Sequence, residues 1–481
     1  MFNIKKFFLC TLISSILITS AGVDVKATQD IPDKEAVIAN NKAIPVESNR
    51  VEGWPAGPEV GAEAAILMDA STGAVLYSKN IHNHYYPAST TKILTTYIAA
   101  SRCSMDETVT FSDYAINNTP RDSNHIAMDV GDTLSMSDCL KAILIRSANE
   151  VSFAVGEHIS GSNDEFAKLM NETAKEMGCE DSNFVNPNGL PDPNHYTSCY
   201  DLATIGRYFF DNELLCEMTK TSMLVIQKPN GTLNDYNAMK LIPGRKYEYK
   251  YLVGCKTGFT KEARYCLVSC AERDGLKLIC VVMKDEDPYH YEDTISLFEY
   301  GFGNFKKVYI ADTENEFSMD DSLPYIAAGE DTGLNESLLY VNPKDSMVMP
   351  AAIDFKDLKR EIVYDSPTPG TAAKVVYSYN GVYLGEASIE YSKKLPQVSE
   401  IFGEGKSEDS KSKKSFIYIN IMNLGKILLV LGVLILIALG VRLTFKFFVV
   451  GERSSRLPLT KEQKRNIREA RRRLRRRSRR R

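Results

Sequence analysis

A serine and a lysine one helical turn apart are the residues in this sequence whose types and spacing most directly suggest chemistry. They stand in the run Pro87-Ala88-Ser89-Thr90-Thr91-Lys92. If Ser89 opens a helix, Lys92 lies on the same face one turn later. An unprotonated lysine amine can activate a serine hydroxyl as a nucleophile, and burial beside a second cation lowers the pKa of a lysine enough for that. The positive end of the helix also favours an oxyanion near Ser89.

Two further short motifs could complete such a site. They are Ser147-Ala148-Asn149, in the run IRSANE, and Lys256-Thr257-Gly258-Phe259, in the run GCKTGFT. Lys256 can bind a substrate carboxylate and supply the second cation, and Gly258 lets a substrate backbone pass close to its strand. Each motif alone occurs by chance in many proteins. In this order, roughly 60 and 110 residues apart, the three match the layout of active-site serine enzymes that react with penicillin.

The elements that must position these motifs follow from turn signals and hydrophobic periodicity. We expect an apolar hairpin over Ala62–Ser78 that turns at 69–73, then helices, then three strands and a last helix. The expected helices are Thr90–Ala100, two within Leu134–His158 that split near Arg146–Asn149, Glu165–Met177 and Thr294–Phe302, and the expected strands are Tyr251–Gly254, Arg264–Ala271 and Leu276–Met283. This order predicts an α/β (α+β) fold with one antiparallel sheet.

After about Lys306 the helical periodicity nearly vanishes. Short strand patterns over Ala373–Tyr379 and Val382–Tyr391 flank the turn Asn380-Gly381, which is typical of a β-hairpin. We therefore expect a small all-β domain over residues 306–396. Residues 397–420 are rich in Gly, Ser, Lys and Glu and are expected to form a flexible tether.

With these motifs and elements, the segment from Ala62 to about Phe302 resembles the serine D-alanyl-D-alanine carboxypeptidases, the low-molecular-mass penicillin-binding proteins. The runs that carry the resemblance are AAILMDASTGAVLYSKN, PASTTK, NPNGLPDPNHYTSCYDLA and KTGFT. Residues 306–396 resemble the C-terminal domain of the same family. The resemblance implies a penicillin-binding/β-lactamase-like transpeptidase fold. It also implies removal of the terminal D-alanine from peptidoglycan stem pentapeptides, with covalent inhibition by β-lactams.

The resemblance also assigns roles to the motif residues. Ser89 is the acyl-enzyme nucleophile, Lys92 its general base, Ser147 a proton shuttle and Asn149 the residue that positions the substrate amide. Lys256 and Thr257, with Gly258 and Phe259 beside them, form the substrate-binding strand, and the backbone N–H groups of Ser89 and Phe259 form the oxyanion hole. No cofactor and no metal ion is implied.

Two histidines have competing interpretations. His195 lies in the run HYTS, where it either structures a loop or takes a chemical role, since histidine is the usual acid–base residue. His290 stands where family members often carry an arginine close to the substrate carboxylate. It could make carboxylate recognition weaker and pH dependent between pH 5.5 and 8, or it could be an ordinary surface residue.

Two other functions compete with the carboxypeptidase hypothesis. A β-lactamase shares the acyl-serine site, but class A enzymes deacylate with a glutamate-activated water, and Cys179–Ser198 holds no clear equivalent. A non-catalytic wall-binding scaffold is the second alternative, and the presence of all three motifs argues against it.

The net charge of −4 hides two oppositely charged parts. From Arg442 to Arg481 there are 17 Lys and Arg against three Glu, a charge of +14, so the rest of the chain carries −18. Such asymmetry suggests a compartment boundary or a partner. The acidic part is not expected to bind nucleic acid, because it cannot neutralise phosphates.

Apolar segments near both ends suggest where that boundary lies. Residues 1–27 read as a signal peptide, with a retained anchor as the alternative. The uncharged run Ile427–Val441 favours a transmembrane helix over 421–445, and its lack of a polar face argues against a buried core helix. The basic tail, 446–481, would stay in the cytoplasm, near anionic lipids or recruiting an acidic partner. The catalytic domain, 56–305, would then face outward behind a linker, 28–55.

Nine cysteines remain after the expected signal peptide, an odd number, and none forms a CxxC pair. Cys266 and Cys270 alternate with apolar residues in a strand-like run. We therefore expect most of the nine to be buried core thiols rather than a disulfide framework.

Overall fold

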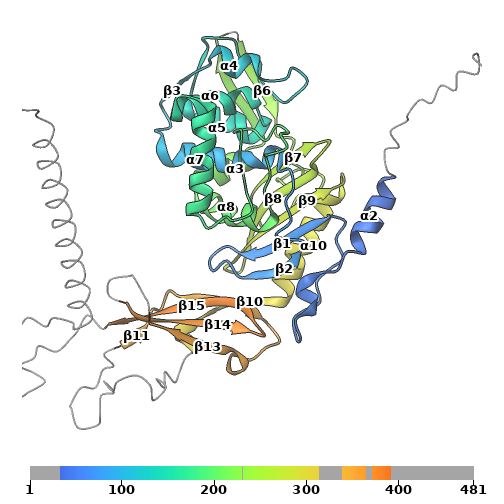
Figure 1. Ribbon diagram of the computed structural model, residues 1–481, viewed down its shortest axis with the longest axis vertical. Coiled ribbons are helices and arrows are strands. Elements are labelled where there is room, and N and C mark those ends of the chain that lie inside the picture. Colours follow the sequence, from blue (N-terminus) through green and yellow to red (C-terminus); the bar gives the residue numbers. More distant parts are fainter. Residues whose placement is uncertain (1–32, 230, 314–338, 365–370, 392–481) are drawn as a thin grey trace, which may run out of the picture. The chain divides into compact units, whose positions relative to one another are not determined.

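The central element of the fold is a five-stranded antiparallel sheet. The computed structural model of the chain describes residues 33–229, 231–313, 339–364 and 371–391. The strands run in the order β2-β1-β9-β8-β7 (Figure 1). Their bounds are β1 (Ala64–Asp69), β2 (Val75–Lys79), β7 (Leu252–Thr260), β8 (Arg264–Arg273) and β9 (Leu276–Asp285). The predicted hairpin and the three later strands are all present in one antiparallel sheet.

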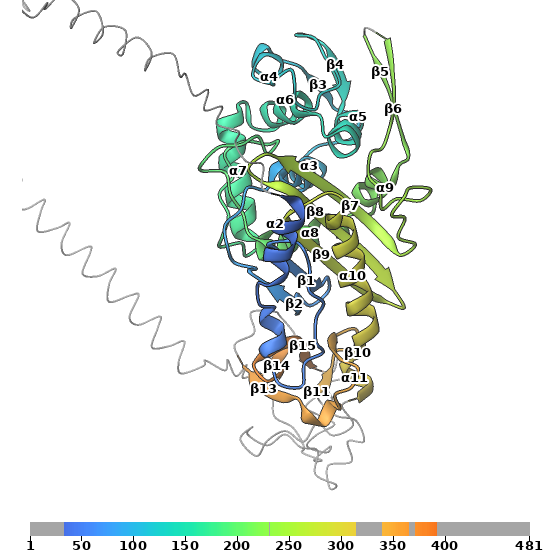
Figure 2. The same ribbon diagram turned by 90° about the vertical axis from the view of Figure 1, so that its right-hand side faces the viewer.

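The two faces of this sheet bury two different cores. Alternate residues of a strand point to opposite faces, so Ile66 and Val281 join the core with the helices α3, α6 and α8. Leu67 and Val282 join the other core, with α10. Figure 2 shows α10 lying along the sheet. The bounds of these helices are α3 (Lys92–Arg102), α6 (Asn149–Ser160), α8 (Cys199–Asp211) and α10 (Tyr289–Asn304).

The remaining helices pack around α3 and α6 to form a helical lobe. They are α4 (Asp113–Asn117), α5 (Met136–Lys141), α7 (Asn163–Glu176) and α9 (Glu213–Lys220). Two small hairpins accompany them, β3 (Thr108–Thr110) with β4 (Thr133–Ser135) and β5 (Met223–Lys228) with β6 (Gly231–Tyr236). The β5–β6 hairpin extends outward from the lobe (Figure 2). The split predicted near Arg146 is a π-helical turn over Ala142–Arg146, which ends at Ser147 in the left-handed region, φ 58°.

The predicted linker over 28–55 is wrong for its described part. It contains the helix α2 (Lys34–Lys42) and a 3-10 turn over Glu47–Arg50. Lys79 is fully buried and its ammonium donates to the carbonyl oxygen of Asn41 in this region, and to those of Val60 and Ala62 just after it, at 2.7–2.9 Å. Trp54 is also buried and donates to the carbonyl of Leu76 at 2.9 Å. Tertiary contacts, which leave no periodic signal, hold this segment in place.

A second antiparallel sheet follows α10. Its strands run β10-β12-β15-β14-β13, with β11 beside β15. The bounds are β10 (Phe305–Tyr309), β11 (Leu339–Val341), β12 (Ser346–Pro350), β13 (Lys359–Val363), β14 (Thr371–Tyr379) and β15 (Val382–Tyr391), and a short helix α11 (Ile310–Thr313) follows β10. Both turn residues of the predicted hairpin, Asn380 and Gly381, have positive φ. The core of this sheet is continuous with the core between the five-stranded sheet and α10.

All nine cysteines of the described residues are free, and eight of them are buried. This agrees with the prediction of core thiols, and Cys103 is the partly exposed one. The predicted signal peptide, tether, transmembrane helix and basic tail lie outside the described residues. Within the described ranges, no helix combines the length and the apolar character that a bilayer crossing needs.

Candidate active site

The three sequence motifs meet at one cleft of about 810 Å³. Among the residues that line it are seven of the eight predicted site residues, Ser89, Ser147, Asn149, Lys256, Thr257, Gly258 and Phe259. The eighth, Lys92, is completely buried and lies beneath Ser89. The cleft therefore runs between the start of α3, the turn before α6 and the strand β7.

Ser89 sits in a 3-10 turn, Ala88–Thr91, that leads directly into α3. The α-helix thus begins at Lys92, two residues later than predicted. Ala88 has φ 49°, an uncommon conformation for a residue with a side chain. Gly189 packs against it so closely that a Cβ there would lie 1.7 Å from the Ala88 carbonyl oxygen. The loop containing Gly189 therefore holds the strained turn that presents Ser89.

The buried amine of Lys92 has three polar neighbours. Its Nζ lies 3.0 Å from Ser89 Oγ, 2.7 Å from Asn149 Oδ1 and 2.5 Å from the carbonyl oxygen of Asn188. Burial holds the pKa of Lys92 well below its usual value, and the charge of Lys256 lowers it further. A neutral amine has two N–H bonds and one lone pair. The two carbonyl oxygens can accept the N–H groups, which directs the lone pair toward the Ser89 hydroxyl.

Ser147 and Asn149 enter the cleft from the start of α6. The left-handed backbone of Ser147 turns the chain between the π-helical turn and α6. Its hydroxyl is buried and has no hydrogen-bond partner among the described residues, so it is available to a bound molecule. The backbone N–H of Asn149 donates to the Asn124 carbonyl at 2.8 Å, which fixes the start of the helix.

Lys256 supplies a positive charge from β7. It is 1% exposed, its ammonium donates to the Thr257 carbonyl at 2.7 Å, and burial lowers its pKa to about 8. The group is therefore charged at neutral pH. An ammonium has three N–H donors, so donors remain for an anion in the cleft.

The structure gives a reason for Gly258 beside the predicted passage of a substrate backbone. A Cβ at this position would lie 2.9 Å from the Pro87 carbonyl oxygen and 3.0 Å from the backbone nitrogen of Ser89. The strand β7 therefore presses against the turn that carries Ser89. This contact within the protein requires glycine at position 258, independently of any bound substrate.

His195 connects a loop to the start of α3. It is buried, its Nδ1 accepts from the Val185 N–H at 3.1 Å, and its Nε2 lies 2.9 Å from Thr91 Oγ1. Burial lowers its pKa to about 4, so the ring is neutral at ordinary pH. Because Nδ1 accepts, Nε2 carries the proton and donates to Thr91. This geometry agrees with the loop-structuring interpretation of His195.

The interpretation of His290 as an ordinary surface residue is wrong. The side chain is 2% exposed, so it is not a surface residue. Its ring packs against Tyr265 and Tyr291, with centroids 4.9 and 4.0 Å away. Burial lowers its pKa to about 4, below the range in which a pH-dependent carboxylate contact was expected. His290 lines the cleft as a neutral aromatic surface.

Sequence reasoning missed several residues of the site. Asn188 is 1% exposed, accepts from Lys92 with its carbonyl and lines the cleft. Glu150 lies behind Asn149, accepts from the Ile126 N–H at 2.6 Å, and has a pKa raised by burial. Lys240 and Asp287 form an ion pair of 3.0 Å on the cleft wall. The run NPNG around Asn188 served only as part of the family resemblance, and no role followed for Asn188, because a backbone acceptor leaves no mark on residue type.

An antiparallel sheet beside a helical lobe, with a cleft serine on a buried lysine facing a Lys-Thr-Gly strand, is the arrangement of the acyl-serine enzymes that react with penicillin. Residues 52–287 match the family model described as D-alanyl-D-alanine carboxypeptidase, Peptidase S11. The segment 52–287 is thus similar to this family.

Individual relatives agree with the family match. The chain is 31% identical over 255 residues to the D-alanyl-D-alanine carboxypeptidase DacF of Bacillus subtilis, covering 51% of this chain and 63% of that protein. It is 29% identical over 371 residues to DacA of Haemophilus influenzae, covering 72% and 88%. The chain thus spans less than two thirds of the length of DacF, but most of DacA.

Solved structures show the same fold. Penicillin binding protein 5 from Haemophilus influenzae has a TM-score of 0.55 at 24% identity, and the match covers 70% of this chain and 98% of that one. Penicillin binding protein 6B from Escherichia coli has a TM-score of 0.54 at 25% identity, with the same coverage. Since these matches cover 70% of the chain, they extend beyond the segment matched by the family model.

Proposed function

We propose that the protein is a serine D-alanyl-D-alanine carboxypeptidase that removes the terminal D-alanine from peptidoglycan stem pentapeptides. One observation carries the proposal. A serine hydroxyl in a cleft lies 3.0 Å from a fully buried lysine amine whose pKa is strongly lowered. That pair is a nucleophile and a base in hydrogen-bond reach of each other. The match to the family model and the names of the relatives support the choice of substrate.

In the proposed acylation, Ser89 Oγ attacks the carbonyl carbon of the penultimate D-alanine while the Lys92 amine takes the hydroxyl proton. The backbone N–H groups of Ser89 and Phe259 stabilise the oxyanion. Ser147 passes the proton from Lys92 to the leaving nitrogen, so that free D-alanine departs and Lys92 is neutral again. The unpartnered hydroxyl of Ser147 supports this shuttle.

Substrate binding and deacylation use the same groups. Lys256 and Thr257 bind the terminal carboxylate, and Asn149 positions the substrate amide, with Gly258 and Phe259 on the same strand. After D-alanine leaves, Lys92 takes a proton from water, the hydroxide attacks the acyl carbon, and the proton returns to Ser89 Oγ. A β-lactam would acylate Ser89 in the same way. No step requires a cofactor.

A β-lactamase would have to hydrolyse that penicilloyl ester rapidly. Among the described residues that line the cleft, the carboxylates are Asp122 and Asp287, and Asp287 is paired with Lys240. No glutamate among them stands in the position of a water-activating base. A cleft serine beside a buried lysine amine of lowered pKa also has no purpose in a wall-binding scaffold.

The domain organisation is part of the proposal. Residues 56–305 would form the catalytic domain and 306–396 the small β domain, outside the cytoplasm, after removal of the signal peptide 1–27. A transmembrane helix over 421–445 would anchor the enzyme at the end of the tether 397–420. The tail 446–481 would remain in the cytoplasm beside anionic lipids. The support is the charge and hydropathy of the sequence.

The test is mass spectrometry of a pentapeptide muropeptide incubated with the full-length chain in detergent. The expected product is the tetrapeptide plus one D-alanine, and penicillin should leave a long-lived adduct on Ser89. The Ser89→Ala variant is the control and should give neither. Rapid release of the penicilloyl group would instead indicate a β-lactamase. An unchanged pentapeptide with no adduct would contradict the proposal.

A further inference from the structure

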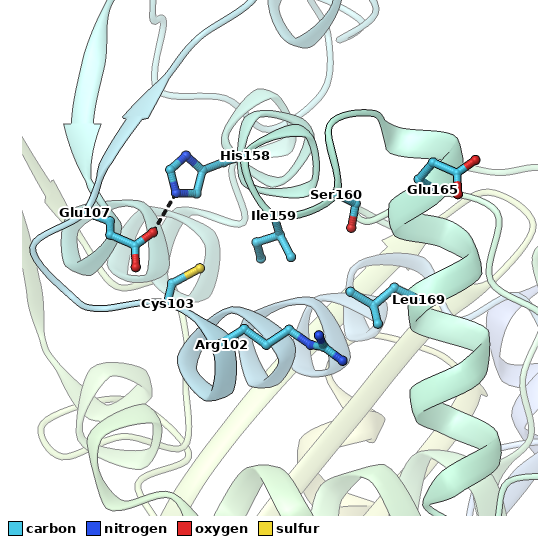
Figure 3. A pocket seen from close by; sticks show the side chains of 8 residues that line it. All are labelled: Arg102, Cys103, Glu107, His158, Ile159, Ser160, Glu165 and Leu169. Atoms are coloured by element: carbon cyan, nitrogen blue, oxygen red, sulfur yellow. Dashed lines mark hydrogen bonds and ion pairs between the residues drawn. The ribbon is translucent and has the colours of Figure 1, made fainter.

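A second group of chemistry-bearing side chains lies outside the active-site cleft. One ligand atom each from Cys103, Glu107 and His158 lies within 4.8 Å of the other two. The closest pair is Glu107 Oε2 and His158 Nε2, at 2.9 Å. The trio lies on the wall of a pocket of about 550 Å³. Figure 3 shows the three side chains gathered at one end of the pocket, while the Arg102 side chain extends toward Leu169.

The trio connects the far ends of the two helices that carry the catalytic groups. Cys103 is the C-terminal cap of α3, which begins at Lys92. His158 lies in the last turn of α6, which begins at Asn149. A helix of 11 residues is about 16 Å long, so the trio stands at the opposite end of α3 from the Ser–Lys pair.

The position of the trio favours a cation. The C-terminal end of a helix carries a partial negative charge, and the last turns of α3 and α6 both supply a member of the trio. Glu107 adds a carboxylate just before β3, and its second oxygen accepts from the Ser104 N–H at 2.6 Å. That contact fixes one carboxylate oxygen and leaves the other facing His158, as an outer-shell contact does for a metal ligand.

We propose that Cys103, Glu107 and His158 form a binding site for a divalent metal ion of the zinc class. Thiolate sulfur, imidazole nitrogen and carboxylate oxygen are the three ligand types of zinc in proteins. Tetrahedral zinc with bonds of about 2.0–2.3 Å places its ligand atoms roughly 3.4–3.6 Å apart. The observed separations, from 2.9 Å between Glu107 and His158 up to at most 4.8 Å, lie on either side of this value. The fourth position opens to the pocket, where water completes the coordination.

The bound ion links the C-terminal ends of α3 and α6. It therefore stabilises the helical lobe from the side opposite to the active site and takes no part in the acyl-transfer reaction. This proposal does not depend on the carboxypeptidase activity.

The experiment uses the full-length chain in detergent, freed of metal by a chelator and of any affinity tag. Zinc is added and the bound metal is counted by elemental mass spectrometry after dialysis. One equivalent is expected, with a rise in the thermal midpoint. Co²⁺ in place of zinc should give a thiolate-to-metal charge-transfer absorption band. This spectrum is recorded on the unmodified protein, so it does not depend on the folding of any variant.

Variants identify the ligands. Cys103→Ser should abolish the charge-transfer band, and Glu107→Gln and His158→Asn should each weaken zinc binding by about 100-fold or more. His82→Asn is the matched control, because His82 also pairs with a carboxylate, that of Asp181, at 2.8 Å. It should bind zinc as the unmodified protein does. Equal zinc uptake by the Cys103→Ser variant, or a Co²⁺ spectrum without the thiolate band, would overturn the proposal.

Discussion

Thr91 and His195 stand 104 residues apart in the sequence and face each other in the core, with 2.9 Å between Thr91 Oγ1 and His195 Nε2. This contact joins the start of α3 to the loop that carries Asn188 and Gly189. Asn188 accepts from Lys92, and Gly189 packs on Ala88. His195 is therefore a positioning residue that acts through this loop.

Replacing His195 with alanine should slow penicillin acylation of Ser89 by about 10- to 100-fold, because the loop that orients Lys92 loses its anchor. The shape of the pH–rate profile above pH 5.5 should not change, since the pKa of His195 is about 4 and its ring is already neutral there. His84→Ala, an exposed histidine stacked on Tyr196, is the control and should acylate normally. Loss of one limb of the profile in His195→Ala would show a direct acid–base role instead.

Lys92 should set the acid limb of the acylation profile. Its pKa is lowered by burial and by Lys256, and only the unprotonated amine is a base, so acylation is lost as pH falls through the pKa of the folded protein. Lys256→Met removes a nearby positive charge and should raise the pKa of Lys92, which moves this limb to higher pH. The measurement is the second-order rate of penicillin acylation against pH. A limb that moves to lower pH would contradict the electrostatic coupling.

Lys256 should set the alkaline limb of kcat/KM for the pentapeptide. Its pKa is about 8, so its charge is lost as pH rises through that value, and the terminal carboxylate then binds more weakly. We expect kcat/KM to fall above about pH 8. Lys256→Arg is the matched variant, because arginine stays charged. It should flatten the alkaline limb even if the activity at neutral pH is lower, and an unchanged limb would point to another group.

Gly258→Ala should disable the site without unfolding the protein. The added Cβ would come within 2.9–3.0 Å of the backbone of Pro87, Ser89 and Thr90, and a shift of the Ser89 turn of about 1 Å can slow catalysis by 10²-fold. Gly303→Ala is the control, because a Cβ there meets nothing within 4 Å. Acylation rate and thermal midpoint are measured for both. Normal acylation by Gly258→Ala would show that the turn can move freely.

Lys79→Met should loosen the N-terminal segment. It leaves the carbonyls of Asn41, Val60 and Ala62 without their shared donor, which is expected to lower the free energy of unfolding by about 3 kcal/mol or more. Lys277→Met removes a contact to one carbonyl, that of Phe210, and should have a smaller effect. Denaturant titration gives both values, and limited proteolysis should cut the Lys79→Met chain first near α2. Equal effects of the two substitutions would argue against the three-carbonyl anchor.

The meeting of the three motifs could be predicted because each lies at the end of an element with a clear pattern. Ser89 precedes a helix, Ser147 interrupts one, and Lys256 lies on a strand, and the antiparallel order of the strands limits how they can assemble. The helix α8 was missed even though Ser198 and Asp201 form a capping pattern, seen as a 3.1 Å bond from the Asp201 N–H to Ser198 Oγ.

Other features of the site depend on tertiary contacts that residue types do not record. Asn188 contributes a carbonyl oxygen, which every residue has. Gly258 is explained by the turn that it touches rather than by its own strand. The burial of His290 follows from the tyrosine rings on either side of it. For Asn188 and Gly258 the deciding neighbours, Lys92 and the Ser89 turn, are far away in the sequence.

The pairing of β1 with β9 has a consequence for the order in which the protein can fold. Ala64 of β1 lies opposite Met283 of β9. The first hairpin of the sheet can therefore pair with β9 only after almost the whole catalytic region is present. Non-local pairing of this kind forms slowly. The five-stranded sheet therefore cannot be completed until β9 has been synthesised, so its two halves are joined late, across more than 200 residues of intervening chain.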